Sequence, residues 1–199
     1  SIASIPGMKE RTIIVSGVSK SYAWTGGRVG WAVLPTAEEA AAFRNLNINY
    51  FSCVPAYNQQ GAAHAIESPE SARSIAAMVA EFERRRNFIV PALNAIDGIT
   101  CAMPQGAFYV FPNISGVCER LGIREGFASS VFQMFLLFEH GVATLDRKSF
   151  GQIGTEGKHY LRISIATAMA DLEEAVARIE RAANDADGFR RFMAKGRAT

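Results

Sequence analysis

A glycine-rich loop at residues 16–28, placed between two apolar runs, constrains this chain more than any other feature. Residues 12–15 (Thr-Ile-Ile-Val) and 29–34 (Val-Gly-Trp-Ala-Val-Leu) are apolar and rich in β-branched side chains, which suit a pleated strand that has no polar face. We therefore expect two buried strands, with Pro35 ending the second. The small residues between them let the backbone turn sharply and come close to a ligand. The pattern predicts a ligand site at the end of a buried strand.

One lysine and one arginine stand in this loop, and together they suit an anionic carbonyl compound. Lys20 follows a strand end, where α/β proteins place ligands, and its amine would be a nucleophile if part of its population were neutral. A nearby guanidinium, together with desolvation, would favour that neutral form. Arg28 is a fork-shaped donor for a phosphate or carboxylate. The alternative is a surface lysine in a flexible turn, which a Ser-Lys pair alone would favour.

Residues 16–30 (Ser-Gly-Val-Ser-Lys-Ser-Tyr-Ala-Trp-Thr-Gly-Gly-Arg-Val-Gly) resemble the Schiff-base lysine segment of the class I/II aminotransferases. These are fold type I enzymes that use pyridoxal 5′-phosphate (PLP), and in them a Ser-Lys is followed by an aromatic residue, a Thr-Gly and an Arg-x-Gly. The resemblance implies that Lys20 is the catalytic residue that forms the Schiff base and that Arg28 binds the cofactor phosphate. Gly17 and Ser19 fit the cofactor-binding pattern too.

Two positions in the loop depart from the family pattern. Many relatives have a methionine where Trp24 stands and a tryptophan where Gly27 stands. We expect these changes to affect the packing of the loop and the shape of the pocket, and to leave the Schiff-base chemistry intact.

A second arginine stands on a predicted strand. Residues 160–166 (Tyr-Leu-Arg-Ile-Ser-Ile-Ala) alternate with period two, which puts Leu161, Ile163 and Ile165 on one face and Arg162 on the other. Such an arginine commonly points to water. It would also be a planar fork on a rigid strand, suited to bidentate binding of a carboxylate.

Three segments favour the second interpretation of Arg162. Residues 104–109, 141–143 and 160–164 look like successive motifs of the aminotransferase C-terminal domain, in the family order. By that resemblance, Arg162 binds the α-carboxylate of the amino acid substrate.

The resemblance extends from about residue 7 to residue 179 and implies an α/β fold class: the C-terminal part of a fold type I large domain plus the small α+β C-terminal domain. Residues 1–68 would be a remnant of the large PLP-binding domain with the Schiff-base lysine loop. Residues 69–97 would be a long connecting helix, and residues 98–199 the small C-terminal α+β domain.

Several functional parts of the family cannot be assigned in this sequence. They are a phosphate-binding turn, an aromatic residue that stacks on the cofactor, an asparagine, and an aspartate that keeps the pyridine nitrogen protonated. Glu10 is the only acidic residue before Lys20, and it is in the wrong place. We therefore expect a C-terminal fragment that has little or no transaminase activity alone and that exposes apolar surface.

Local signals predict the remaining elements. Thr36 is a capping residue for a helix to about residue 49, and Ser68 followed by Pro69 begins a long helix. We expect this helix to bury an apolar stripe and to be bent or interrupted at Pro91. The stripe comprises Ile75, Met78, Val79, Phe82, Phe88 and Ile89. Further helices are expected at residues 57–65, 126–140, 171–184 and 187–195, strands at 99–102, 107–111 and 142–145, and a glycine-rich loop at 149–157.

Composition excludes several other classes of protein. The 21 basic and 19 acidic residues nearly balance, so no nucleic acid or acidic membrane partner is expected. Three widely spaced cysteines and three isolated histidines favour free thiols in a reducing compartment and no metal site. No apolar run reaches membrane-spanning length. We expect a cytoplasmic protein.

The function that the resemblance implies is a ping-pong transamination between an amino acid and a 2-oxo acid, with PLP as cofactor and a homodimer as the full-length form. A non-transaminating PLP enzyme, such as a carbon–sulfur lyase or a decarboxylase-like relative, would share Lys20 and Arg28. A non-catalytic α/β interaction module would not need the lysine. A phosphate-loop nucleotide binder is the weakest alternative, because the glycine directly before the lysine of that motif is absent.

Overall fold

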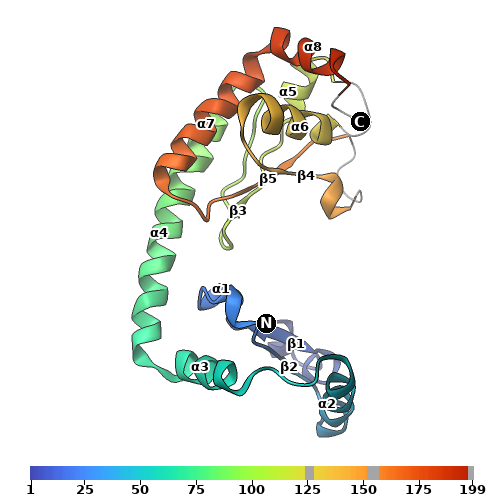
Figure 1. Ribbon diagram of the computed structural model, residues 1–199, viewed down its shortest axis with the longest axis vertical. Helices are drawn as coiled ribbons and strands as arrows, with labels where there is room; N and C mark the ends of the chain where they lie inside the picture. Colours follow the sequence, from blue (N-terminus) through green and yellow to red (C-terminus); the bar gives the residue numbers. More distant parts are fainter. Residues whose placement is uncertain (124–127, 152–156, 197–199) are drawn as a thin grey trace. The chain divides into compact units, whose positions relative to one another are not determined.

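The computed structural model describes residues 1–123, 128–151 and 157–196. The chain divides into two compact units, Ser1–Met78 and Val79–Thr199, and the division falls within one long helix, α4 (Figure 1). Both units contain helices and strands, which confirms a mixed α/β protein. The assignment of the units to particular domains stays a prediction.

Unit 1 begins with a two-stranded antiparallel sheet. Strand β1 pairs with β2 so that Ile14 lies opposite Val33 and Gly17 lies opposite Gly30. The elements of this unit are η1 (Ile2–Ser4), η2 (Lys9–Arg11), β1 (Ile14–Gly17), α1 (Val18–Ser21), η3 (Thr25–Gly27), β2 (Gly30–Val33), α2 (Ala37–Phe51) and α3 (Ala56–Glu67).

The two strands form close to where they were predicted, but the prediction that they are buried is wrong. The side chain of Val15 is 79% exposed, and Val33 is 53% exposed. An apolar β-branched run indicates a strand that is stable when covered. It does not indicate which segment covers it, and no element of residues 1–78 does so.

The helix starts follow the predicted capping chemistry. The Thr36 hydroxyl accepts a hydrogen bond from the Glu39 amide at 3.2 Å, and the Glu39 carboxylate accepts one from the Thr36 amide at 3.1 Å. This capping box begins α2, which ends at Phe51, two residues later than predicted. The Ser68 hydroxyl accepts from the Glu70 amide at 3.2 Å and begins α4 (Pro69–Asn94).

Helix α4 differs from its prediction in two respects. Its buried side chains are Ile89, Val90 and Leu93 at the C-terminal end, whereas Val79 is 57% exposed. Pro91 lies inside the helix and does not end it. A proline removes one helical hydrogen bond, and burial of the three neighbouring apolar side chains offsets that loss.

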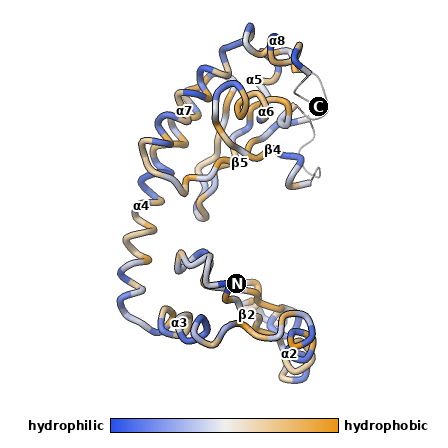
Figure 2. The backbone as a smooth tube through the Cα atoms, in the orientation of Figure 1, coloured by the Kyte–Doolittle hydropathy of each residue, from blue (hydrophilic) through white to orange (hydrophobic). Residues whose placement is uncertain are grey.

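Unit 2 contains a three-stranded antiparallel sheet of order β3-β5-β4. Helix α6 packs against α5, α7, α8 and β4, and hydrophobic residues recur along it in Figure 2. The elements are β3 (Tyr109–Val110), α5 (Ser115–Arg120), α6 (Ala128–His140), β4 (Leu145–Asp146), η4 (Lys148–Phe150), β5 (Leu161–Ser164), α7 (Met169–Asn184) and α8 (Ala186–Ala194).

The core of unit 2 is aromatic. Phe135 lies 5.3 Å from Phe189 and 5.5 Å from Phe192, measured between ring centroids, and contacts His140 edge-on. Along β5, Leu161 and Ile163 are buried, as the period-two pattern predicted. The last two helices also form close to their predicted positions.

Three predicted elements are shorter or shifted. The strand expected at residues 107–111 forms only at Tyr109–Val110. The strand expected at residues 99–102 is reduced to a bridge between Thr100 and Asn113, and the strand expected at 142–145 forms at Leu145–Asp146. The Asn94 side chain provides the reason for the change at residues 99–102. It accepts a hydrogen bond from the Cys101 amide at 2.7 Å and donates one to the Cys101 carbonyl at 2.9 Å, in place of a neighbouring strand.

Parts of two predictions lie outside the described residues. These are the start of the helix expected at residues 126–140 and residues 152–156 of the glycine-rich loop. Helix α6 is followed by Gly141 at φ +66°, the left-handed conformation expected of a glycine that ends a helix.

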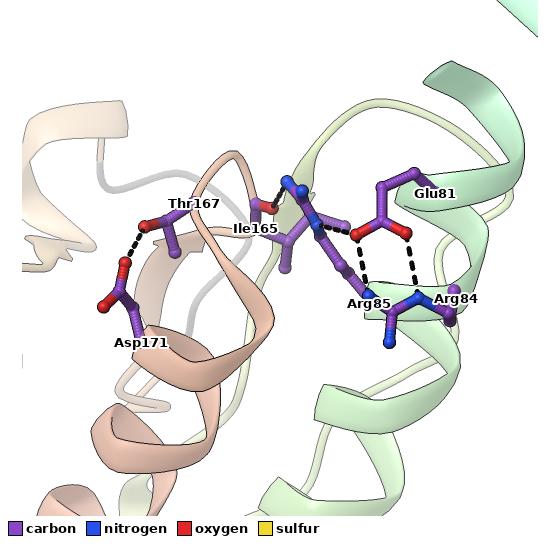
Figure 3. A network of polar contacts seen from close by, with 6 residues as sticks. All are labelled: Glu81, Arg84, Arg85, Ile165, Thr167 and Asp171. Carbon is purple, nitrogen blue, oxygen red and sulfur yellow. Dashed lines mark hydrogen bonds and ion pairs between the residues drawn. The ribbon is translucent and has the colours of Figure 1, made fainter. Parts of the chain in front are cut away.

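A polar network joins α4 to the segment that follows β5 (Figure 3). The Glu81 carboxylate accepts hydrogen bonds from Arg84 at 2.8 and 2.9 Å and from Arg85 at 2.7 Å, and Arg85 also donates to the Ile165 carbonyl at 3.3 Å. The hydrogen bonds from Arg84 and Arg85 lower the pKa of Glu81 to about 2. The Glu81 carboxylate therefore fixes the arginine that links the two segments.

Candidate functional site

Lys20 stands on a single helical turn directly after β1. Helix α1 begins at Val18, and Gly17 is its capping residue. The Val18 side chain is fully buried, and its amide donates to the Val29 carbonyl at 3.1 Å. These contacts tie the turn to the start of β2 and leave Lys20 exposed on it.

Gly17 is required by the close approach of the two strands. A Cβ atom at this position would lie 2.8 Å from the Val29 carbonyl oxygen and 3.2 Å from the Gly30 Cα atom. Any larger residue would therefore push the strands apart at the base of the loop. Gly17 acts on the loop through backbone packing.

Arg28 stands at the other end of the same connection. Its backbone is left-handed, with φ +52°, and its Nη1 atom donates to the Thr25 carbonyl at 2.8 Å. A guanidinium has five N–H donors, so this bond leaves others for an anion. Because Gly17 is opposite Gly30, Lys20, Ser19 and Arg28 all lie in the connection at one end of the hairpin.

Lys20 is exposed in this chain. Its role in forming the Schiff base stays a prediction, because the apolar run beside the lysine does not indicate which segment would cover it.

The two positions that depart from the family pattern contact each other. A Cβ atom at Gly27 would lie 2.6 Å from the indole ring of Trp24, and a Cβ atom at Gly61 would lie 2.8 Å from its Cη2 atom. The Asn58 side-chain amide donates to the Gly27 carbonyl at 2.9 Å, and this hydrogen bond connects α3 to the loop. The Trp24 ring thus occupies the space that a side chain at position 27 would need.

Sequence reasoning missed the contribution of α3. Asn58 lies 31 positions after Gly27, and Gly61 lies further still along the chain. The departures from the family pattern at positions 24 and 27 were the sequence feature that could have indicated altered packing around the loop. A large and a small residue that exchange places in one loop indicate a shared packing space.

Arg162 belongs to unit 2 and stands on the central strand of its sheet, opposite Leu145 of β4. It is half-buried, and its neighbours Leu161 and Ile163 face the core. Its guanidinium carbon lies 4.2 Å from the centre of the Tyr109 ring and 4.9 Å from that of Phe150. The sequence predicted the face on which Arg162 lies but not these two rings.

The residues of the β1–β2 connection have part of the chemistry that binding of PLP requires. An amine and a guanidinium lie in one loop with the Ser19 hydroxyl, and Gly17 allows the backbone to pack tightly beneath them. An aldehyde would meet the amine, and a phosphate would meet the guanidinium and the hydroxyl. This donor set fits the cofactor.

Two other features are absent from the described part of the chain: a cluster of metal ligands and a helix able to span a membrane. Residues 1–123, 128–151 and 157–196 contain no group of three or more His, Cys, Asp or Glu side chains that could hold a metal ion. Among the same residues, no helix is both long enough and apolar enough to span a membrane.

Comparison with known families gives one match that covers most of the chain. Residues 2–179 match the model of the family described as aminotransferase class I and II. The chain is 38% identical over 180 residues to an aspartate aminotransferase of Rhizobium meliloti, covering 89% of this chain and 42% of the relative. It is also 38% identical over 183 residues to aromatic-amino-acid aminotransferase 2 of Thermococcus litoralis, covering 91% of this chain and 43% of the relative.

Solved structures give the same match. The aromatic aminotransferase from Pyrococcus horikoshii aligns with a TM-score of 0.82 at 34% identity, over 94% of this chain and 47% of that one. The aspartate aminotransferase from Rhizobium meliloti aligns with a TM-score of 0.77 at 36% identity, over 90% of this chain and 43% of that one. The chain thus spans less than half the length of the relatives that it matches.

Proposed function

This chain belongs to the class I and II aminotransferase family, and from that premise we propose that it carries the reactive lysine and two anion-binding arginines of a PLP-dependent aminotransferase. The activity proposed is transfer of an amino group from an amino acid to a 2-oxo acid. The observation that carries the proposal is the loop between β1 and β2, where Lys20, Arg28 and Ser19 share one end of a hairpin.

Lys20 holds the cofactor through its side-chain amine and, when neutral, accepts a proton from the substrate α-carbon. Its position on a short helical turn after β1 supports this role, because the buried Val18 fixes the turn and Lys20 itself is exposed. PLP, when bound, supplies an electron sink for the pair left on the α-carbon.

Arg28 and Ser19 bind the cofactor phosphate in this proposal. Arg28 is anchored at one nitrogen by the Thr25 carbonyl, which orients the remaining N–H groups of its fork. Gly17 keeps the backbone of the loop close to β2, so that Ser19 and Arg28 stay at the same end of the hairpin.

Arg162 binds the substrate α-carboxylate. It stands on a central strand with both neighbours buried, and a fork on such a rigid support suits bidentate binding. The substrates are an amino acid and a 2-oxo acid. Two relatives are named for aspartate and for aromatic amino acids, which makes these the first substrates to test.

The finer fold assignment is part of the same proposal. Unit 1 would belong to the PLP-binding large domain of a fold type I enzyme, and unit 2 to its small C-terminal domain, with α4 connecting them. The alignments with longer solved aminotransferase structures support this assignment. We also propose that the full-length enzyme is a homodimer, for which the exposed aromatic residues Tyr50, Phe51 and Tyr57 are candidate contacts.

Trapping of the cofactor on Lys20 tests the proposal directly. The chain is incubated with PLP, reduced with borohydride and mapped by peptide mass spectrometry. We expect label on Lys20, loss of that label in Lys20→Ala, and no change in Lys9→Ala, since Lys9 is also exposed in unit 1. Arg28→Gln should weaken retention of PLP before reduction, whereas Arg11→Gln should not. Label spread evenly over surface lysines would contradict the assignment.

Product analysis separates transamination from other PLP chemistry. We expect little or no turnover by the 199-residue chain alone, because the aspartate partner of the pyridine nitrogen cannot be assigned in it. In the intact enzyme, formation of a 2-oxo acid with matching amination of a second 2-oxo acid supports the proposal. Release of ammonia and a thiol, or of carbon dioxide, would instead support a lyase or a decarboxylase. A non-catalytic interaction module would keep its function in Lys20→Ala.

A further inference from the structure

The aromatic rings around Arg162 come from both sides of its strand. Tyr109 belongs to β3, and Phe150 ends η4, which follows β4. Since the sheet order is β3-β5-β4, one ring comes from a strand that flanks β5 and the other from the short helix that follows the opposite flanking strand. The guanidinium carbon lies 4.2 Å from the first ring centre and 4.9 Å from the second.

Strand register explains the first contact. Tyr109 pairs with Ser164, two residues beyond Arg162 on β5. Residues two apart on a strand face the same side, so Tyr109 and Arg162 are diagonal neighbours on one face, within reach of an aromatic ring. The pairing of β3 with β5 therefore places Tyr109 next to Arg162.

A second layer of aromatic residues supports these rings. Phe111 contacts Phe150 edge-on at 6.1 Å and stacks on Tyr160 at 5.1 Å with an interplanar angle of 9°. On the other side, Phe108 lies 4.5 Å from Tyr109. These ring contacts restrict the rotamers of the two rings that contact Arg162.

Resting on the function proposed above, we propose that Tyr109 and Phe150 are positioning residues that hold the Arg162 guanidinium for a substrate carboxylate. An aromatic face attracts the flat face of a guanidinium, while the N–H donors lie in the plane of the group. Stacking and carboxylate binding therefore use different parts of the same side chain. The rings orient the fork without occupying its donors.

The surroundings of Arg162 are consistent with this role. Within the described ranges, the two rings are its side-chain partners, and no described carboxylate forms an ion pair with it. An arginine that is already oriented loses less side-chain entropy when a carboxylate binds. The rings also occupy space beside the guanidinium carbon that water would otherwise fill, which strengthens its attraction for an anion.

Nuclear magnetic resonance of the 199-residue chain tests the contact itself. The Arg162 side-chain Nε–Hε signal is identified by its absence in Arg162→Lys. We expect Phe150→Leu and Tyr109→Leu to shift this signal, because each removes a ring current. Phe150→Tyr and Tyr109→Phe keep a ring and should leave it nearly unchanged. Phe138→Leu is the matched control, since Phe138 is 51% exposed in the same unit and Phe150 is 44% exposed.

Titration with pyruvate, as a simple 2-oxo acid, tests the consequence. We expect Phe150→Leu and Tyr109→Leu each to weaken binding about two- to fivefold, the effect of losing one cation–π contact. The ring-retaining variants and Phe138→Leu should bind like the unaltered chain. Far-ultraviolet circular dichroism confirms that each variant is folded.

The outcomes separate this proposal from the one that it rests on. Binding that disappears in Arg162→Lys but is unaffected by loss of either ring would overturn the positioning role and leave the carboxylate assignment standing. Binding unaffected by Arg162→Lys, or no binding by the unaltered chain, would overturn both. An Nε–Hε signal that does not respond to loss of either ring would show that the stacked arrangement is not formed.

Discussion

Residues 1–78 and residues 79–196 carry similar apolar patterns but bury them to very different extents. In residues 1–78, all of which are described, the buried apolar side chains are Val18 and Ala62. The described part of unit 2 has a continuous core that extends from Ile89 to Phe192. The comparison shows that secondary structure can form without a packed hydrophobic core. Unit 1 contains helices and a hairpin, but few of its apolar side chains are buried.

This difference has a consequence for the two candidate sites. The β1–β2 connection, with Lys20 and Arg28, stands in the unit whose apolar surface is largely exposed. Arg162 stands on a sheet that covers a core. We therefore expect the arginine on β5 to be held rigidly in this chain and the lysine loop to be the more mobile of the two.

Matched phenylalanine substitutions should give the largest difference between the units. Phe135 is fully buried in unit 2, and Phe51 is 77% exposed in unit 1. Phe135→Ala should lower the free energy of unfolding by about 3–5 kcal/mol, and Phe51→Ala should change it by less than about 0.5 kcal/mol. Urea unfolding followed by circular dichroism measures both. Equal effects would mean that unit 1 has a core that the structure does not reveal.

Two adjacent glycines test whether unit 1 has any specific packing. A Cβ atom at Gly27 would lie 2.6 Å from the ring of Trp24, whereas nothing lies within 4 Å of one at Gly26. Gly27→Ala should displace the ring and destabilise the loop by about 1–3 kcal/mol, while Gly26→Ala should be near neutral. Trp24 fluorescence in a Trp31→Phe background reports the displacement. Combining Trp24→Met with Gly27→Trp should restore the packing.

Substitution of Asp146 measures how much a buried polar group contributes to the stability of unit 2. Asp146 accepts hydrogen bonds from the Ser130 hydroxyl and from the Ser149 amide and hydroxyl at 3.1 and 2.6 Å. Burial by itself raises the pKa of Asp146, but these hydrogen bonds outweigh burial and hold the pKa below its usual 3.8. Asp146→Asn should cost about 1–3 kcal/mol of unfolding free energy at neutral pH, measured by urea unfolding.

The sign of the acid dependence follows from that lowered pKa. The contribution of Asp146 is complete above pH 3.8 and is lost as the pH falls through the lower pKa of the folded state, because the unfolded chain binds the proton more readily. The stability of Asp146→Asn should therefore depend less on pH in this range. Glu10→Gln, at an exposed carboxylate of unit 1, is the control and should leave the dependence unchanged.

His140 should give a smaller effect at slightly acid pH. Burial lowers the pKa of His140 below its usual 6.5, and Asp185, at 3.8 Å, opposes that change without overcoming it. The stabilising contribution is complete above pH 6.5 and is lost as the pH falls through the folded pKa. Thermal unfolding between pH 7 and pH 5 should show a decrease that is reduced in His140→Phe. An unchanged decrease would mean that other groups cause it.

Glu81 should give the smallest effect, because its ion pairs with Arg84 and Arg85 are accessible to solvent. Its pKa of about 2 means that its contribution is present above pH 4.5 and is lost as the pH falls toward 2. Glu81→Gln should lower the melting temperature slightly at low salt and not at high salt. Glu180→Gln, at an exposed position on α7, should have no effect in either buffer.

Local signals in the sequence were reliable where a residue and its partner are close together in the chain. Thr36 and Glu39 form the predicted capping box three residues apart. The alternation around Arg162 placed Leu161 and Ile163 in the core correctly. Such features depend on backbone geometry, which neighbouring residues determine.

Apolar patterns were less reliable as guides to burial. All three apolar runs, those of β1, β2 and β5, predict strands. Val15 of β1 is nevertheless exposed, whereas Ile163 of β5 is buried. The difference lies in whether another element of the chain covers the strand. An apolar run does not indicate which other segment, if any, packs against the strand and buries it.

The sequence by itself determined the chemistry of this protein: a lysine and an arginine in a tight loop, a second arginine on an alternating strand, and the motif order that indicated the family. Only the tertiary structure decided which groups surround them. It placed Gly61 against Trp24, and Tyr109 and Phe150 against Arg162. The physical reason is that functional groups belong to single residues, whereas packing is made between segments far apart in the chain.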